Sequence, residues 1–137
     1  MKIIGLNKKE KVFLGGTCNN STWRDRLIPM LDVDYFNPVV KDWTPECQAE
    51  EIKQRENCDI VLYCITPLML GVYSIAEVVD DSNKRPTKTI LICLKDDDNK
   101  SFDKTQWKSI AQLMKMVESN GANVFLDLES AAKYINS

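Results

Sequence analysis

Histidine is absent from the chain of 137 residues, and neither sign of charge dominates, since the formal net charge is −2. Without histidine there is no Ser–His or Cys–His pair to activate a nucleophile, and a common zinc ligand is missing. A nearly balanced charge gives no electrostatic reason to expect binding to polymeric nucleic acid or to a membrane surface. These absences exclude several common hydrolase and metalloenzyme sites.

Long apolar runs are also missing. No run approaches the ~20 apolar residues of a membrane span, and the N-terminal stretch MKIIGLNKKEKV is too short and too polar for a secretory signal. The five cysteines are odd in number and include no CxxC pair. Cys64 and Cys93 lie in apolar runs, which indicates reduced, buried thiols. We therefore expect a cytoplasmic protein, without a metal ion or another cofactor.

Apolar strand-like runs alternate with helical patterns along the chain, without a repeat or a linker. This alternation is typical of one doubly wound α/β domain, residues 1–137, with parallel strands. The expected strands are 11–14, 34–36, 59–65, 88–94 and 123–126. The expected helices are 22–31, 45–57, 71–79, 104–120 and 128–135. Ligands of such sheets bind beyond the carboxyl ends of the strands, so a site is expected in the loops 15–21, 37–45, 66–71 and 95–103.

The first of these loops combines glycines with polar side chains. Gly15 and Gly16 would let a ligand approach the backbone closely, and Thr17 and Arg24 would add polar donors. The same residues also suit a tight turn between a strand and a helix. Both interpretations stay open at this stage.

The second loop places an aromatic ring beside an amide and a carboxylate. Trp43 could stack on a planar base, while Asn37 and Asp42 form hydrogen bonds with it. The alternative is a loop stopped by Pro38, with a partly buried tryptophan. Asp59, just before the next strand, could contact a ligand or could satisfy neighbouring backbone N–H groups.

The stretch GVYSIAEVV, residues 71–79, carries a single carboxylate, Glu77, among mostly apolar residues. Such a glutamate is either a solvated helix residue or a reactive group beside the end of the preceding strand. Ser74 and Glu77 are three residues apart and therefore share a helix face, which points back toward the strand ends.

Five motifs follow one another in the order V-F-L-G-G-T, W-R, Y-F-N-P-V-V, D-I-V-L-Y-C-I-T-P and G-V-Y-S-I-A-E. Over about residues 12–94, their order and spacing resemble the nucleoside 2-deoxyribosyltransferase-like family. The resemblance implies a flavodoxin-like doubly wound sandwich with a five-stranded, mostly parallel sheet. The chain departs from the family in loop 67–71, which has no carboxylate, and at Phe13, where the transferases have a tyrosine. It is identified as a distant member.

The resemblance also implies a reaction, the cleavage or exchange of the N-glycosidic bond of a (deoxy)nucleoside or a nucleoside monophosphate. Glu77 would be the nucleophile that forms a covalent glycosyl-enzyme intermediate, and Glu51 a second acid or base. Carboxylates suit this chemistry because they stabilise an oxocarbenium-like transition state and can trap it. The residues expected to bind substrate are Gly15, Gly16, Thr17, Arg24, Asn37, Asp42, Trp43, Asp59, Thr66, Gly71 and Ser74.

Three functions remain open from the sequence. The protein could be an enzyme of glycosyl transfer or hydrolysis, a module that binds or sequesters a nucleotide derivative in the same pocket, or a protein that keeps only the fold. Transfer and hydrolysis need the same nucleophile and differ in whether a second base or water reaches the intermediate. The partner is expected to be a nucleoside, nucleotide or nucleobase, and assembly of the related enzymes makes a homo-oligomer plausible.

Overall fold

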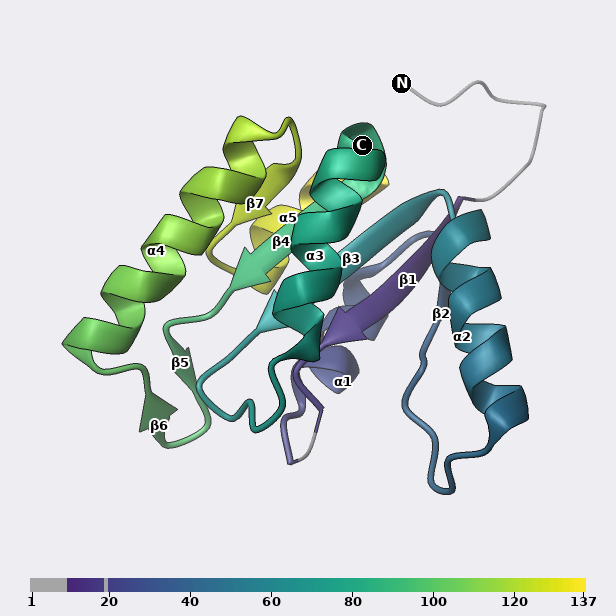
Figure 1. The fold of residues 1–137 in the computed structure, drawn as a ribbon, viewed down its shortest axis with the longest axis horizontal. Helices are drawn as coiled ribbons and strands as arrows, with labels where there is room; N and C mark the ends of the chain where they lie inside the picture. Colours follow the sequence, from purple (N-terminus) through teal and green to yellow (C-terminus); the bar gives the residue numbers. More distant parts are fainter. Residues whose placement is uncertain (1–9, 19) are drawn as a thin grey trace.

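A five-stranded parallel sheet forms the centre of the computed structural model, which describes residues 10–18 and 20–137. The strands stand in the order β2-β1-β3-β4-β7 (Figure 1). Their bounds are β1 Lys11–Gly16, β2 Asp34–Phe36, β3 Ile60–Ile65, β4 Thr89–Cys93 and β7 Asn123–Phe125. The expected α/β fold with a flavodoxin-like arrangement is confirmed.

Helices cover both faces of this sheet. Their bounds are α1 Trp23–Leu27, α2 Pro45–Asn57, α3 Tyr73–Lys84, α4 Lys104–Ser119 and α5 Leu128–Asn136, with 3-10 turns at Ile28–Met30 and Pro86–Lys88. Side chains of α1 and α5 form one buried cluster with one face of the sheet, and side chains of α3 and α4 form the other. Helix α2 lies near the β2 end of the sheet and has no fully buried residue (Figure 1).

The chain reverses its direction of winding between β1 and β3. From β1 it first adds β2 on one side and then returns to add β3, β4 and β7 on the other. The loops after β1 and β3 therefore diverge at adjacent strand ends, and this is the point at which doubly wound sheets hold ligands. Both loops were among those expected from the sequence to carry a site.

Two helices differ from the expectation by more than one residue at an end. The helix expected over 22–31 ends at Leu27 and continues as a 3-10 turn over Ile28–Met30. Pro29 explains this early end, because it has no backbone N–H to donate to the carbonyl four residues earlier and its ring clashes with that carbonyl. Helix α3 starts later and runs further than the expected 71–79, ending at Lys84.

The sequence expectation also missed a short hairpin. Strands β5 (Asp96–Asp97) and β6 (Lys100–Ser101) pair antiparallel within the segment expected to be a loop. Buried Asp97 ties this hairpin to the loop after β1, accepting a hydrogen bond from Ser21 at 2.6 Å and pairing with Arg26 at 2.8 Å. No helix within the described part of the chain is long and apolar enough to cross a membrane.

Candidate functional site

Two positions at the end of β1 require glycine, because atoms of β3 lie too close for a side chain. A Cβ atom on Gly16 would lie 2.2 Å from the backbone oxygen of Cys64, and the φ angle of Gly16 is +116°, in the region that favours glycine. A Cβ atom on Gly15 would lie 2.7 Å from the ring of Tyr63. The glycines thus let β1 approach β3 closely at the switch point.

Two buried threonines join the loops that leave these strands. The N–H of Thr17 donates to the carbonyl of Cys64 at 2.8 Å, and the N–H of Thr66 donates to Oγ1 of Thr17 at 3.0 Å. Oγ1 of Thr66 in turn accepts from the N–H of Leu68 at 3.1 Å. Because Thr66 is fully buried and occupied in this way, its role is to fix the loop geometry.

Arg24 stabilises the end of β1 and the loop that follows it. Its guanidinium donates to the carbonyls of Leu14 at 3.0 Å, Thr17 at 2.7 Å and Gly16 at 3.4 Å. It also stacks over the ring of Trp23, 4.4 Å from the ring centroid. Burial lowers the pKa of Arg24. The side chain is thus occupied by the backbone of the strand end that borders the site.

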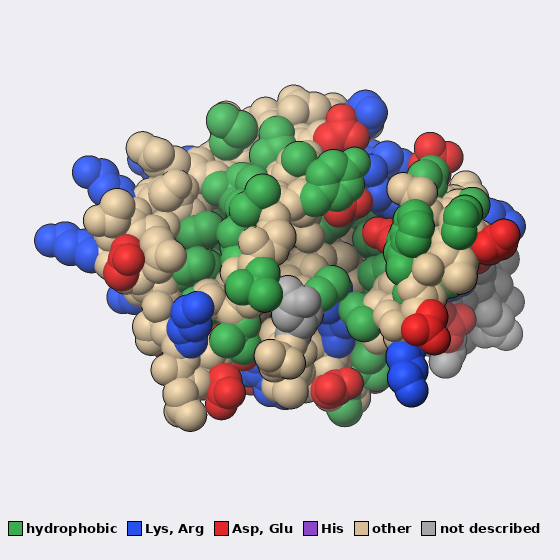
Figure 2. Space-filling model, turned by 60° about the horizontal axis from the view of Figure 1, so that its bottom comes forward, with side chains coloured by type: hydrophobic (Ala, Val, Ile, Leu, Met, Phe, Trp, Pro, Cys, Tyr) green, Lys and Arg blue, Asp and Glu red, His purple; other side chains and the backbone are tan. Residues whose placement is uncertain are grey.

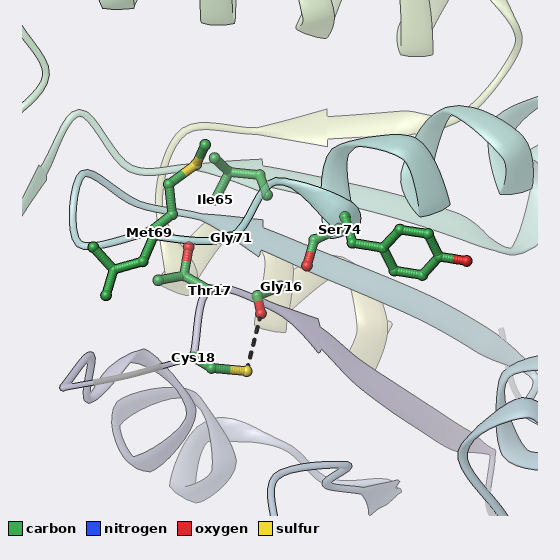
Figure 3. Close-up of a pocket in the computed structure, with 9 residues that line it drawn as sticks. Gly16, Thr17, Cys18, Ile65, Met69, Gly71 and Ser74 are labelled. Carbon is green, nitrogen blue, oxygen red and sulfur yellow. Dashed lines mark hydrogen bonds between the residues drawn. The ribbon is translucent and has the colours of Figure 1, made fainter. Parts of the chain in front are cut away.

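A cavity of about 180 Å³ opens above these strand ends. Figure 3 shows the Ser74 hydroxyl, Thr17 and the Cys18 thiol around the same space, with Met69 and Ile65 on another side. The thiol of Cys18 donates to the carbonyl of Gly16 at 3.5 Å. The residues that line the cavity are Gly16, Thr17, Cys18, Ile65, Met69, Leu70, Gly71, Tyr73 and Ser74.

A second cavity of about 320 Å³ adjoins the first at Cys18. Its polar lining comes from the loop after β1, from α1 and from the loop after β2. The residues are Cys18, Asn20, Ser21, Arg24, Asp25, Asn37 and Val39. Oδ1 of Asn37 accepts the backbone N–H of Val39 at 3.0 Å, so this amide shapes its own loop and also faces the cavity.

Exposed apolar side chains surround this edge of the sheet. Figure 2 looks onto it and shows hydrophobic side chains spread over the middle of the face. Trp43 is 63% exposed, so it is not the partly buried ring of the alternative interpretation, and Asp42 beside it is exposed too. The large exposed apolar residues of the nearby loops and of the first turn of α3 are Val39, Val40, Trp43, Leu70, Val72 and Tyr73.

Glu77 lies one helical turn beyond Ser74 in α3, with a side chain that is only 13% exposed. Burial raises the pKa of Glu77 to about 7, against a lowering by Arg55, and the negative charges of Glu51 and Asp81 raise it further. Burial also raises the pKa of Glu51, while Arg55 and Arg24 lower it. The two carboxylates expected from the resemblance therefore lie within one electrostatic cluster, although α2 and α3 carry them.

The centre of this cluster is Arg55, which the sequence did not single out. Its Nε donates to Oδ2 of Asp81 and to the hydroxyl of Tyr63, both at 3.0 Å. Its Nη2 donates to Oδ1 of Asp81 and Oδ2 of Asp80, both at 3.1 Å. The hydroxyl of Tyr63 donates to the fully buried Asp81 at 2.6 Å. In a helix rich in charged residues, one more arginine carries no signal in the sequence.

Asp59 is the one expected contact that lies far from this edge. It precedes β3, and its Oδ2 accepts the backbone N–H of Lys11 at the start of β1, at 2.8 Å. The amino ends of the parallel strands lie opposite the carboxyl ends, so Asp59 performs the structural role that was its alternative. The remaining expected residues lie around the two cavities, in the loops beside them or in the cluster of Glu77.

The comparison with known protein families supports the same identification. Residues 9–97 match the family described as "Nucleoside 2-deoxyribosyltransferase like", so the chain belongs to this family. A comparison with curated proteins finds no match. The match runs from β1 to β5, so it covers every strand of the five-stranded sheet except β7, and it includes Glu51, Arg55 and Glu77. Family membership indicates glycosyl transfer on a small nucleoside-like molecule.

Proposed function

We propose that the protein cleaves or exchanges the N-glycosidic bond of a (deoxy)nucleoside or nucleoside monophosphate, with Glu77 as the nucleophile. The observation that carries this proposal is the pair of partly buried carboxylates, Glu77 on α3 and Glu51 on α2, on both of which the positive charge of Arg55 acts. Most enzymes that cleave glycosidic bonds use two carboxyl groups in distinct environments, one as an acid and the other as a nucleophile or base.

In the first step, an oxygen of ionised Glu77 forms a bond to the anomeric carbon of the sugar. The carbon–nitrogen bond breaks, and the base leaves with the electron pair. A pKa near 7 leaves an appreciable fraction of Glu77 ionised at neutral pH. The developing positive charge on the sugar is stabilised by this carboxylate, which then holds the sugar as an ester.

Glu51 supplies the proton that the departing base requires. Burial raises its pKa, which favours the protonated form that a general acid needs. In the second step, the resulting Glu51 carboxylate takes a proton from water or from a second base, which attacks the anomeric carbon and releases Glu77. Water gives hydrolysis, and a second base gives transfer.

The surrounding loops provide places for the two halves of the substrate. The cavity bounded by Gly16, Thr17, Gly71 and Ser74 offers hydroxyls and accessible backbone to a sugar. The exposed ring of Trp43 offers a flat apolar face to a base, with Asn37 and Asp42 as hydrogen-bonding groups in the same loop. Arg24 takes part by holding the backbone beside the sugar.

Chromatography of free base released from a panel of deoxynucleosides and their monophosphates tests this function. Glu77→Gln should abolish release and Glu51→Gln should lower it by about 10²-fold or more, as expected for loss of a general acid. Two neighbours provide matched controls: Asp80→Asn, also on α3 and also bonded to Arg55, and Glu50→Gln, beside Glu51 on α2. Both controls should retain release within a few-fold.

Each reaction is run with and without a second base. A new nucleoside in the presence of that base identifies transfer, and free sugar identifies hydrolysis. If folded wild type releases no base from any substrate, the enzymatic proposal is wrong. Calorimetric binding of the same compounds without turnover would then identify a binding or sequestering module.

A further inference from the structure

Arg55 contacts Glu77 in two ways. Its Nε lies 3.8 Å from Oε2 of Glu77, and its Nη2 donates to the backbone carbonyl of the same residue at 3.4 Å. Glu51 is four residues before Arg55 in α2, and the positive charge of Arg55 acts on its carboxyl too. One guanidinium therefore serves both carboxylates of the proposed reaction.

The guanidinium is itself held in place. Asp81 is fully buried and binds Arg55 through both carboxylate oxygens, which is the bidentate geometry that orients an arginine most strongly. Tyr63 binds the same Asp81 and the same Nε. Burial, helped by the hydrogen bond to Asp81, raises the pKa of Tyr63, so the hydroxyl stays protonated and keeps its donor.

The charged groups that act on Glu77 come from two helices. Arg55 and Glu51 belong to α2, and Asp81 belongs to α3. The positive charge of Arg55 favours the ionised form of the Glu77 carboxylate. The negative charges and the burial act in the opposite direction. Arg55 thus favours the ionised Glu77, and the Asp81–Tyr63 pair holds Arg55 in place.

We propose that Arg55 is a positioning residue, which orients the Glu77 carboxylate and keeps it ionised while Asp81 and Tyr63 hold Arg55 in place. Its importance for the reaction rests on the proposed function, but its effect on Glu77 does not. An opposite charge at this distance changes the pKa of a carboxyl by about 1–3. Loss of Arg55 therefore raises the pKa of Glu77 by at least about 1.

The test is a ¹³C NMR titration of the glutamate side-chain carboxyls in the full chain, with the Glu77 signal assigned through Glu77→Gln. Arg55→Gln removes the charge and keeps a hydrogen-bond donor toward Asp81. Arg85→Gln is the matched control, because Nε of Arg85 also donates to Asp81, at 2.8 Å. Arg55→Lys is the conservative variant, which keeps the positive charge and loses the bidentate contact of the guanidinium with Asp81.

The expected result is a pKa of Glu77 raised by about 1 or more in Arg55→Gln, by less than half as much in Arg85→Gln, and largely restored in Arg55→Lys. An equal rise in both glutamine variants, or no rise in folded Arg55→Gln, overturns the proposal. If Arg55→Gln does not fold, Arg55→Met and Arg85→Met carry the same comparison, because methionine also removes the charge, with a rise expected only in the first.

This readout needs no substrate, so it separates two kinds of failure. Absence of base release by wild type contradicts the proposed function and leaves the titration valid. A purely structural Arg55 would lower the melting temperature in Arg55→Gln without moving the titration of Glu77. Where base release is observed, the rising limb of its pH profile should move with the Glu77 titration.

Discussion

Replacing the proposed nucleophile should stabilise the protein, and only at a pH where Glu77 is ionised. The pKa of Glu77 is about 7 in the folded chain, against an ordinary value of 4.5. Because the native state binds this proton more tightly than the unfolded state does, the free energy of unfolding of wild type falls as the pH rises from about 4.5 through about 7. Glu77→Gln has no carboxyl to ionise at this position, so its free energy of unfolding does not fall for this reason.

The size of the effect follows from the difference of about 2.5 between the two pKa values. At about 1.4 kcal/mol for each pKa unit, the upper limit is about 3.5 kcal/mol. Because the side chain keeps some contact with solvent, about 2 kcal/mol is the expected gain of Glu77→Gln at pH 8–9. At pH 4 the carboxyl is protonated in both states, so the ionisation contributes no difference between the variant and wild type.

Urea unfolding of both proteins at pH 4 and pH 8.5 measures this difference. The change between the two pH values cancels contributions of Glu77→Gln that do not depend on pH, and comparison with wild type cancels the other titrating groups. Asp80→Asn is the control, because hydrogen bonds from Lys84 and Arg55 lower the pKa of Asp80 and its loss should not stabilise the fold at high pH. A gain that is equal at both pH values, or a loss at pH 8.5, would refute the reasoning.

Three further predictions concern the same region. Gly16→Ala should lower the free energy of unfolding by more than about 3 kcal/mol, because its Cβ meets the Cys64 backbone at a positive φ; urea unfolding that matches wild type would contradict this. Arg24→Met should cost about 3–5 kcal/mol through the loss of its hydrogen bonds to three carbonyls, and a loss below about 1 kcal/mol would remove its bracing role. The value of kcat/KM for base release should rise with pH through about 7, as Glu77 loses its proton; a rate that falls over this range would make Glu77 the acid instead.

The sheet could be predicted from the sequence because its strands are short apolar runs with clear boundaries. The six residues of β3, for example, are fully apolar or aromatic and follow a single aspartate. The hairpin β5–β6 could not be predicted in this way, because it has two residues in each strand and depends on the contacts of Asp97 with Ser21 and Arg26. Those partners are more than seventy residues away in the sequence.

The residues of the candidate site also differ in whether the sequence alone could identify them. Glu77 could be selected because it is a lone carboxylate on a mostly apolar stretch, which is a local signal. Arg55 could not, because its significance comes from Tyr63 on β3 and Asp81 on α3, which only the fold brings to it. Asp59 shows the limit of a local argument, since a residue next to a strand can lie at either edge of the sheet.

The most direct test of the central claim is mass spectrometry of wild type that is quenched with acid during turnover of an active deoxynucleoside and then mapped by proteolysis. The account predicts a deoxyribosyl adduct on the peptide that carries Glu77, formed together with one equivalent of free base and absent in Glu77→Gln. Base release that persists in Glu77→Gln, or an adduct that maps to another residue, would contradict it.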